Sequence, residues 1–271
     1  MSIPKVVCFC CTKGRFEILR KSISFFLAQD YENKELVIMN NHEVPLVLSE
    51  ELQSENITVV NKGASTSIEH FVDMMNEVLQ TLEGDFIAPA WDDDDVFLPW
   101  HISSLVKLFT PVTQAVRTTP NYHFYCKDGK PSINMLGCIC EPTHLARMDF
   151  IKEHGIRGAE SNIMHWHASW LYKLTEETIV RGDDTDTAYV LVWDRTCFDD
   201  YPHFHGQCVV NNEGWEAHIV ANGKDTGEGK PLTSCDVKPL YQKIYDALHN
   251  MECPVEATGI IRVAIKLKQY L

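Results

Sequence analysis

The stretch Asp85-Phe-Ile-Ala-Pro-Ala-Trp-Asp-Asp-Asp-Asp-Val-Phe-Leu-Pro99 joins a short apolar run to four consecutive aspartates. A buried strand that ends in carboxylates points them into the crevice where open α/β sheets bind ligands. Four adjacent negative charges repel one another, so solvent or a cation must compensate them, and oxygen ligands favour Mg²⁺, Mn²⁺ or Ca²⁺. In extended backbone, Asp92 and Asp94 share one face and Asp93 and Asp95 the other. The pattern therefore predicts an Asp-x-Asp metal site at Asp92 and Asp94.

Strands and helices are expected to alternate along the first 110 residues, on both sides of this stretch. Continuous apolar runs predict buried strands at 5–12, 35–39, 57–61 and 85–91. Apolar residues at helical spacing predict helices at about 16–27, 66–82 and 99–109. Thr66 and Glu69 read as a capping box, and Pro99 suits the first turn of a helix. The alternation predicts an α/β fold with a largely parallel sheet.

The second half of the chain has a less regular pattern. A hairpin turning at Asp128-Gly129 is predicted over 124–133, followed by strands at 135–140 and 189–193. Helices are expected near 142–154, 160–176, 237–250 and 258–270, and residues 223–231 read as a loop.

Composition limits the classes of partner and the compartment. The 271 residues suit one large domain, and 24 basic against 38 acidic side chains give a net charge of −14. That charge disfavours nonspecific binding to nucleic acid or to anionic membranes. No apolar stretch approaches the ~18 residues of a membrane span, and the start of the chain lacks a signal-peptide layout. We therefore predict a cytoplasmic protein with no membrane span, whose ten cysteines are thiols.

Further motifs accompany the aspartates in a fixed order. The first strand ends in Thr12-Lys-Gly-Arg15, and Leu19 to Tyr31 reads Leu-Arg-Lys-Ser-Ile-Ser-Phe-Phe-Leu-Ala-Gln-Asp-Tyr. Lys34-Glu-Leu-Val-Ile38, Gly84-Asp-Phe-Ile-Ala88 and Phe97-Leu-Pro99 follow. In this order the motifs resemble the family 2 glycosyltransferases of the GT-A fold over residues 1–110. The rest of the chain matches that family only loosely.

The resemblance implies a GT-A fold, with a mixed, mostly parallel central sheet flanked by helices. Residues 1–115 would bind the nucleotide sugar, 116–222 would form the acceptor-binding half of the same domain, and 223–271 a loop and C-terminal helical segment. The implied reaction is metal-dependent transfer of a sugar from a nucleoside diphosphate sugar to a hydroxyl, with inversion.

The same resemblance assigns roles to the aspartates. Asp92 would contact the ribose or the metal, and Asp94 would bind Mn²⁺ or Mg²⁺ directly. The metal would neutralise charge on the departing nucleoside diphosphate. Asp95 matches the acid that follows in the family, or caps the helix expected near Leu98.

The resemblance also predicts the residues that bind the donor. Thr12 and Arg15 fall where the family's first loop meets the nucleotide, and a guanidinium suits phosphate geometry. Asn40 and Asn41 replace aspartates that usually read uracil. An amide oxygen can accept from the uracil imide, yet an amide can also donate to cytosine. Because the amide oxygen can still serve the family's usual recognition of uracil, a UDP-sugar is favoured as the donor. Asn76 keeps one family position, but the arginine usual beside it is Met75 here.

Inverting transfer needs a general base that deprotonates the acceptor hydroxyl. Glu160, His165 and His167 lie where the family carries this group, and the alternatives are Asp183, Asp184 and Asp186. His203 or His205 matches, in chain order, the late histidine that completes the metal shell in this fold.

Two other functions stay open. One is a nucleotidyltransferase or nucleotide-sugar hydrolase of the same fold, although Thr12-Lys-Gly-Arg15 has a single glycine where those enzymes usually carry a glycine-rich loop. The other is a sugar-nucleotide-binding protein without catalysis, which the Asn40-Asn41 replacement and the uncertain base suggest. The acceptor is a glycan, a protein, a small molecule or modified nucleic acid.

Overall fold

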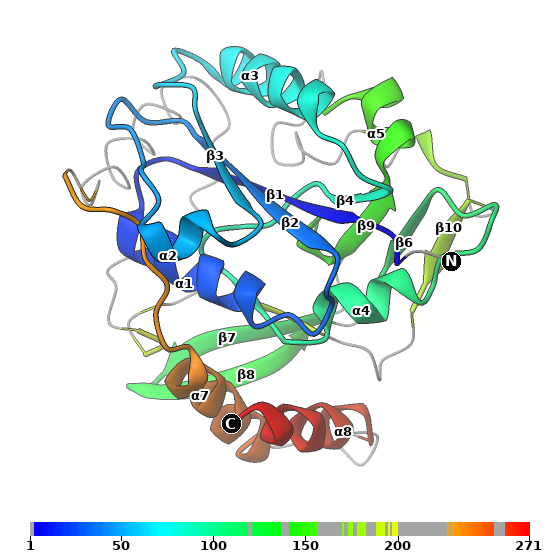
Figure 1. The fold of residues 1–271 in the computed structure, drawn as a ribbon. Helices are drawn as coiled ribbons and strands as arrows, with labels where there is room; N and C mark the ends of the chain where they lie inside the picture. The colour runs from blue at the N-terminus through cyan, green and yellow to red at the C-terminus, as the bar shows by residue number, and fades with distance from the viewer. Residues whose placement is uncertain are drawn as a thin grey trace.

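A computed structural model of the chain describes residues 3–118, 121–136, 141–156, 170, 173–175, 178–182, 188–192, 195, 197–199, 227, 229–251 and 258–271. Its main element is a seven-stranded sheet in the order β10-β6-β9-β4-β1-β2-β3 (Figure 1). These strands are β1 (Val6–Thr12), β2 (Lys34–Asn40), β3 (Ile57–Asn61), β4 (Phe86–Ala88), β6 (Ala115–Arg117), β9 (His144–Arg147) and β10 (Ile179–Arg181).

The strand directions bring most carboxyl ends to one edge of this sheet. β1 pairs in parallel with β2 and β4, β2 pairs in parallel with β3, and β10 does so with β6. β9 is antiparallel to both β4 and β6, so β4 and β6 run in the same direction. The predicted mixed, mostly parallel sheet is confirmed. We call the edge where β1, β2, β3, β4, β6 and β10 end the carboxyl edge.

Helices cover both faces of the sheet, as its continuous apolar strands require. Val7 and Phe9 of β1 pack in one cluster with α3 (Ile68–Thr81) and α5 (Met148–His154), while Cys8 and Cys10 pack in another with α1 (Phe16–Leu27) and α4 (His101–Val106). This alternation is the two-residue period of a strand. Figure 1 shows α3 and α5 above the sheet and α1 and α4 below it.

A second, four-stranded sheet lies beyond α1 and α4 in the order β5-β11-β7-β8. Its strands are β5 (Val96–Phe97), β11 (Tyr189–Val192), β7 (Asn121–Lys127) and β8 (Lys130–Leu136). The predicted hairpin is confirmed, because β7 and β8 turn at Asp128 and Gly129, which have φ values of 52° and 73°. Two positive φ values are typical of the type I′ turn. The strand expected at 135–140 is wrong at its start, since Met135 belongs to β8, and residues 137–140 lie outside the described residues.

The C-terminal helices α7 (Lys238–His249) and α8 (Thr258–Leu267) agree with the predicted ranges; α7 lies against β8 of this second sheet, and α8 packs against α7 (Figure 1). A short helix α2 (Glu50–Gln53) precedes β3, and two 3-10 turns cover Glu141–Thr143 and Lys268–Tyr270. The helix expected over 160–176 lies largely outside the described residues.

Three expected helix starts are corrected. α3 is capped by Ser67, whose Oγ accepts from the His70 amide at 3.2 Å, so Thr66 is not the capping residue. α4 begins at His101, so Pro99 precedes the helix instead of lying in its first turn. The segment expected as a helix from 142 forms β9 first, because residues 144–147 pair with strands on both sides.

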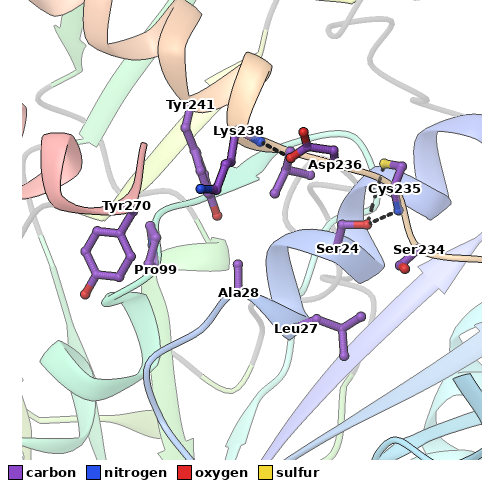
Figure 2. A pocket seen from close by; sticks show the side chains of 11 residues that line it. Ser24, Leu27, Ala28, Pro99, Ser234, Cys235, Asp236, Lys238, Tyr241 and Tyr270 are labelled. Atoms are coloured by element: carbon purple, nitrogen blue, oxygen red, sulfur yellow. Dashed lines mark hydrogen bonds between the residues drawn. The ribbon is translucent and has the colours of Figure 1, made fainter. Parts of the chain in front are cut away.

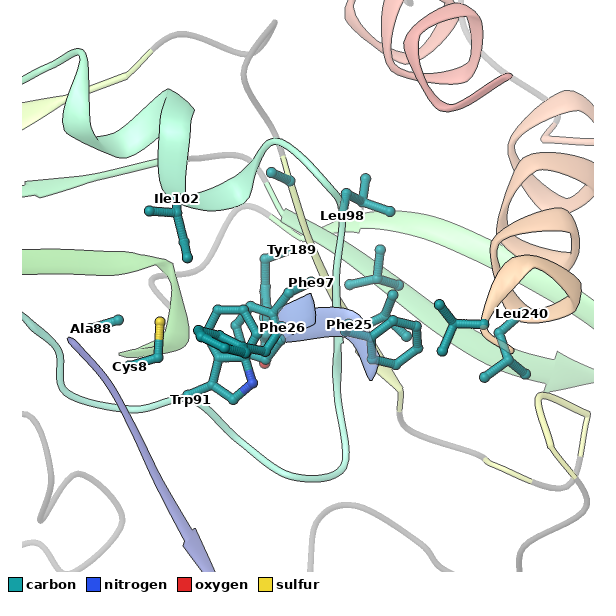
Figure 3. Close-up of a cluster of buried hydrophobic side chains, with 14 of the residues drawn as sticks. Cys8, Phe25, Phe26, Ala88, Trp91, Phe97, Leu98, Ile102, Tyr189 and Leu240 are labelled. Carbon is teal, nitrogen blue, oxygen red and sulfur yellow. The ribbon is translucent and has the colours of Figure 1, made fainter. Parts of the chain in front are cut away.

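Buried aromatic side chains connect the sheet to α1 and to the second sheet (Figure 3). The rings of Trp91 and Phe97 stack at a centroid distance of 3.7 Å, and Phe26 of α1 meets Trp91 edge-on at 6.0 Å. The Trp91 indole donates to Ser22 Oγ at 3.1 Å. Trp91 and Phe97 flank the four aspartates at 92–95, so this packing fixes both ends of the segment that carries them.

Cys126 and Cys197 form a disulfide, so the expectation that all ten cysteines are thiols is wrong for this pair. Cys8 and Cys10 are buried thiols, and burial raises the pKa of each. They behave as small apolar side chains, as expected. The cytoplasmic location stays a prediction. Among the helices of the described ranges, none has the length and apolar content to cross a membrane.

Candidate active site at the aspartate turn

The four aspartates lie in a turn between β4 and β5. Asp93 and Asp94 have turn conformation, so the alternation expected for extended backbone is wrong here. Asp93, Asp94 and Asp95 are buried, and Asp92 is half-buried. We call residues 92–95 the aspartate turn. Its carboxylates therefore need partners inside the protein.

Arg15 supplies the positive charge that the aspartate turn needs. Its Nη1 donates to Asp94 Oδ2 at 2.8 Å, its Nε donates to Asp93 Oδ2 at 3.2 Å, and its Nη2 donates to Asp93 Oδ1. Thr12 Oγ1 also donates to Asp93 Oδ2, at 2.6 Å. Asp93 was expected to point away from Asp94, yet one guanidinium binds both.

The chain bends sharply to bring Arg15 into this position. β1 ends at Thr12, and Gly14 adopts a φ of 76°, in the left-handed region that favours glycine. A Cβ at Gly14 would come within 2.9 Å of the His42 ring. Because β1 and β4 are neighbours, the residues that follow each strand meet at the carboxyl edge. Thr12, Arg15 and the aspartates are therefore brought together.

Burial shifts the protonation equilibria of these groups. Burial raises the pKa of Asp93, and the Arg15 guanidinium opposes that rise. Burial alone would lower the pKa of Arg15, but Asp93 and Asp94 raise it above its ordinary value. Burial, together with the positive charge of Arg15, lowers the pKa of Lys13 to about 6. The carboxylates beside Arg15 thus favour its charged form, whereas burial of Lys13 disfavours its charged form.

Asp95 attaches the aspartate turn to the second sheet. Its Oδ1 accepts from the Val192 amide at 2.8 Å, and its Oδ2 accepts from the Tyr189 hydroxyl. The expectation that Asp95 caps the next helix is wrong, because that helix follows Trp100. Asp95 supports the turn from β11.

Arg195 is a residue of the site that the sequence analysis missed. It is 1% exposed and donates through Nη1 to the Asp94 carbonyl oxygen. Asp199 accepts from Arg195 and, at 2.8 Å, from Lys21 Nζ. Burial alone would raise the pKa of Asp199, but these two cations lower it below its ordinary value. The available signal was the Arg195–Asp199 spacing of four residues, which suits an ion pair on one helical turn.

The two asparagines after β2 have different surroundings. The Asn41 side chain exchanges two hydrogen bonds with Ser65, at 3.0 and 2.7 Å. Asn40 Nδ2 donates to Val44 O and Asn61 Oδ1, both at 2.9 Å. Within the described ranges, no group donates to the buried Asn40 Oδ1. Asn40 thus presents an amide oxygen at the carboxyl edge, beside Thr12 in the strand register.

Several expected site residues lie outside the described residues. These are the candidate bases Glu160, His165, His167, Asp183, Asp184 and Asp186, and the candidate metal ligands His203 and His205. Among the described residues, no three histidine, cysteine or acidic side chains gather as a metal site would need. Asp92 and Asp94 supply carboxylate oxygens, the ligands that hard divalent cations prefer, so their chemistry fits Mn²⁺ or Mg²⁺.

A cavity of about 320 Å³ lies apart from the aspartate turn (Figure 2). It opens between the C-terminal half of α1 and the start of α7, and its walls include Leu27, Pro99, Val237 and Tyr241. The Tyr241 hydroxyl donates to Phe97 O at 3.1 Å, so this group is occupied within the protein. The cavity shares no residue with the aspartate turn.

Comparisons with known proteins support the fold. No family model and no curated protein matches the chain. S. aureus TarS 1–349 in complex with UDP has a TM-score of 0.52 at 12% identity, over 98% of this chain and 83% of that one. S. aureus TarS has a TM-score of 0.51 at 12% identity, over 98% of this chain and 53% of that one. A mannosyltransferase, PcManGT from Pyrobaculum calidifontis in complex with GDP-Man and Mn2+, has a TM-score of 0.43 at 12% identity, over 97% and 70%.

The two TarS matches show a shared fold, and the PcManGT match is too distant to add to it. The predicted GT-A type of fold is therefore confirmed by the sheet and by these structures together.

Proposed function

We propose that the chain is a metal-dependent GT-A glycosyltransferase that transfers a sugar from a nucleoside diphosphate sugar to a hydroxyl, with inversion. The observation that carries this proposal is the hydrogen-bonded set Thr12, Arg15, Asp93 and Asp94, where β1 and β4 end side by side. Open α/β sheets bind their ligands at this position. In the proposal, residues 1–115 bind the donor and residues 116–222 the acceptor.

Asp92 and Asp94 would hold Mn²⁺ or Mg²⁺ in this proposal. When bound, such a cation neutralises charge that develops on a leaving nucleoside diphosphate. Arg195 donates to the backbone carbonyl of Asp94, and the Asp95 carboxylate accepts from the Val192 amide. These two contacts fix the turn that carries the Asp94 side chain. Arg15 orients the Asp94 carboxylate and binds the donor diphosphate. Preorganisation of this kind lowers the cost of binding.

The residues that follow β2 would recognise the base of the nucleotide in this proposal. Asn40 and Asn41 follow β2, and Asn40 Oδ1 is the amide oxygen that accepts no hydrogen bond within the described ranges. An oxygen acceptor matches the imide N–H of uracil, which supports a UDP-sugar as donor.

Glu160, His165 or His167 would act as the general base in the proposal, and His203 or His205 would complete the metal shell. An inverting enzyme needs one such base within hydrogen-bonding reach of the acceptor hydroxyl.

The test is a screen of UDP-, GDP-, dTDP- and CMP-sugars with Mn²⁺, followed by analysis of the products. A donor present at a hundredfold excess over its Kd stabilises the fold by about 2.7 kcal/mol. Release of the free sugar or its transfer, with release of the nucleoside diphosphate, supports a glycosyltransferase. Release of a nucleoside monophosphate would instead indicate a nucleotidyltransferase or a diphosphate hydrolase.

The Asp94→Asn variant should lose the donor response. Asp73→Asn is the matched control, because Asp73 is exposed on α3 and away from the carboxyl edge. Saturable binding of a nucleotide sugar without turnover towards any acceptor or water would identify a binding protein.

A further inference from the structure

Arg117, the last residue of β6, is largely buried and has no carboxylate partner among the described residues. It is 7% exposed, and its Nε has no hydrogen-bond partner. Within the described part of the chain, no carboxylate or carbonyl accepts from its guanidinium. Leaving a buried N–H without an acceptor costs about 1–3 kcal/mol. Arg117 therefore lowers the stability of the fold unless a bound group satisfies it.

The nearest charge in the sheet has the same sign. Arg181 of β10 is the register partner of Arg117, and on the other side the partner is His144 of β9. Register partners point to the same face of a sheet. Burial lowers the pKa of Arg117, and the positive charge of Arg181 lowers it further. Arg181 is exposed, so the pair runs from the buried end of β6 to the solvent.

Three other arginines, Arg15, Arg147 and Arg195, have their guanidinium groups engaged. On the adjacent strand β9, Arg147 donates to Thr113 O at 2.7 Å and to Thr110 O at 3.0 Å. Arg195 is bound to Asp199, and Arg15 to Asp93 and Asp94. The fold thus provides acceptors for buried guanidinium groups elsewhere. Arg117 differs from these arginines because its register partner in the sheet, Arg181, is also positively charged.

The pair lies on the same edge as the aspartate turn. β6 runs parallel to β4 and is separated from it by β9 alone, so the two strands are about 10 Å apart. Figure 1 shows β6 and β10 beyond β9, at the end of the sheet away from β2 and β3. A group bound at Arg117 would lie beside a donor bound at the aspartate turn, on the side away from the nucleotide base.

We propose that Arg117 and Arg181 bind a phosphate group of the acceptor substrate. That the phosphate belongs to the acceptor rests on the proposed glycosyltransferase function, whereas the binding of a phosphate at these arginines does not. Neighbouring strands are about 4.8 Å apart, so both guanidinium groups can approach one tetrahedral oxyanion. Arginine binds phosphate through paired N–H donors. Two positive charges also match the charge of a phosphate monoester near neutral pH, whereas one carboxylate would leave a net positive charge.

Thermal unfolding with inorganic phosphate, in the absence of metal and nucleotide, tests the site. We expect phosphate to raise the Tm of the natural protein, and acetate at equal ionic strength to raise it less. Arg117→Met should raise the Tm in phosphate-free buffer, because it removes a buried charge beside a like charge. It should also weaken phosphate binding by at least about tenfold. Arg181→Met, at an exposed position, should weaken binding without a folding defect.

Two further variants separate the outcomes. Arg147→Met is the matched control on β9, and it should lower the Tm and keep the phosphate response. Arg15→Met reports phosphate bound at the donor site. The proposal is overturned if phosphate does not stabilise the natural protein. It is also overturned if the response survives in Arg117→Met and Arg181→Met, or disappears only in Arg15→Met.

Failure of this proposal is distinguishable from failure of the proposed function. Asp94→Asn should lose UDP binding in the presence of Mn²⁺ and keep the phosphate response. Arg117→Met should show the reverse. Phosphate binding with no binding of any nucleotide would preserve the anion site and contradict the glycosyltransferase proposal.

Discussion

Two arginines at one sheet edge, Arg15 and Arg117, have opposite surroundings. Arg15, after β1, meets Asp93 and Asp94, and these carboxylates raise its pKa. Arg117, at the end of β6, meets Arg181, and burial together with that second guanidinium lowers its pKa. Removing one partner of a buried ion pair is strongly destabilising, because the other charge is left buried and uncompensated, and a buried charge that has no partner already carries such a cost. Among the described residues, the edge thus has a part where charge is balanced within the protein and a part, at Arg117 and Arg181, where we propose that an anion binds.

Removing Arg15 should produce the largest effect. Arg15→Met leaves the buried carboxylates of Asp93 and Asp94 without their guanidinium, which should cost about 3–5 kcal/mol of unfolding free energy. Urea denaturation measures this loss. Arg20→Met is the control, since Arg20 pairs with the exposed Glu17 and donates to the carbonyls of Thr233 and Ser234, so its removal leaves no buried carboxylate without a partner and should cost less than Arg15→Met. A loss below 1 kcal/mol for Arg15→Met would show that the aspartate turn does not depend on this arginine.

Acidification should be the next largest effect. His101 of α4 packs against Trp91 and Phe97, which flank the aspartate turn, and burial lowers its pKa to about 3. In the unfolded chain, His101 binds a proton with a pKa near 6.5. The free energy of unfolding is therefore at its full value above pH 6.5 and decreases as the pH falls from 6.5 towards 3. The loss should reach about 2 kcal/mol at pH 5.

Urea denaturation between pH 7 and pH 5 measures this term. His101→Phe should flatten the pH dependence relative to the natural protein, whereas His249→Phe, at an exposed position on α7, should leave it unchanged. Equal slopes for the natural protein and His101→Phe would contradict the assignment.

The link between the aspartate turn and β11 should give a smaller effect. Tyr189→Phe removes the hydroxyl that donates to Asp95 Oδ2 and should cost about 1–3 kcal/mol, because it leaves a buried carboxylate with one donor fewer. Tyr245→Phe removes an exposed hydroxyl that contacts His249 and should cost much less. If both variants unfold at the same urea concentration, Asp95 does not hold the turn.

The unbalanced part of the edge should give the smallest effect, with the opposite sign. Arg181→Met should stabilise the phosphate-free protein by up to about 0.5 kcal/mol, because it relieves repulsion with Arg117 at an exposed site. Arg262→Met, on the exposed side of α8, should change nothing. Destabilisation of Arg181→Met beyond that of Arg262→Met would mean that Arg181 has a structural partner, and the contrast between the two regions would weaken.

Local sequence patterns were sufficient to predict the fold of the first 110 residues. Continuous apolar runs and helical spacing predicted β1, β2, β3, α1 and α3, because each element buries residues close in the chain. The meeting of Thr12, Arg15 and the aspartates followed from one rule, that parallel neighbours end at the same edge. The pairing of Arg15 with Asp93 did not follow, because a turn at 93–94 breaks the alternation that extended backbone would impose.

Long-range pairing decided what the sequence could not predict. Residues 144–147 have a pattern compatible with a helix, and they form β9 because β4 and β6 both offer them hydrogen bonds. The row Arg181, Arg117 and His144 depends on the register of three strands that lie far apart in the chain. The same holds for Arg195 beneath Asp94 and for the disulfide between Cys126 and Cys197.

The central claim is that the aspartate turn binds the diphosphate of a nucleotide sugar through a divalent cation. Calorimetric titration of UDP into the protein, with and without Mn²⁺, tests it most directly. The natural protein and Asp73→Asn should bind UDP with one site per chain in the presence of Mn²⁺, and Asp94→Asn should not. Equal UDP affinity in Asp94→Asn and the natural protein, or no binding of UDP, GDP, dTDP or CMP with any divalent cation, would contradict the claim.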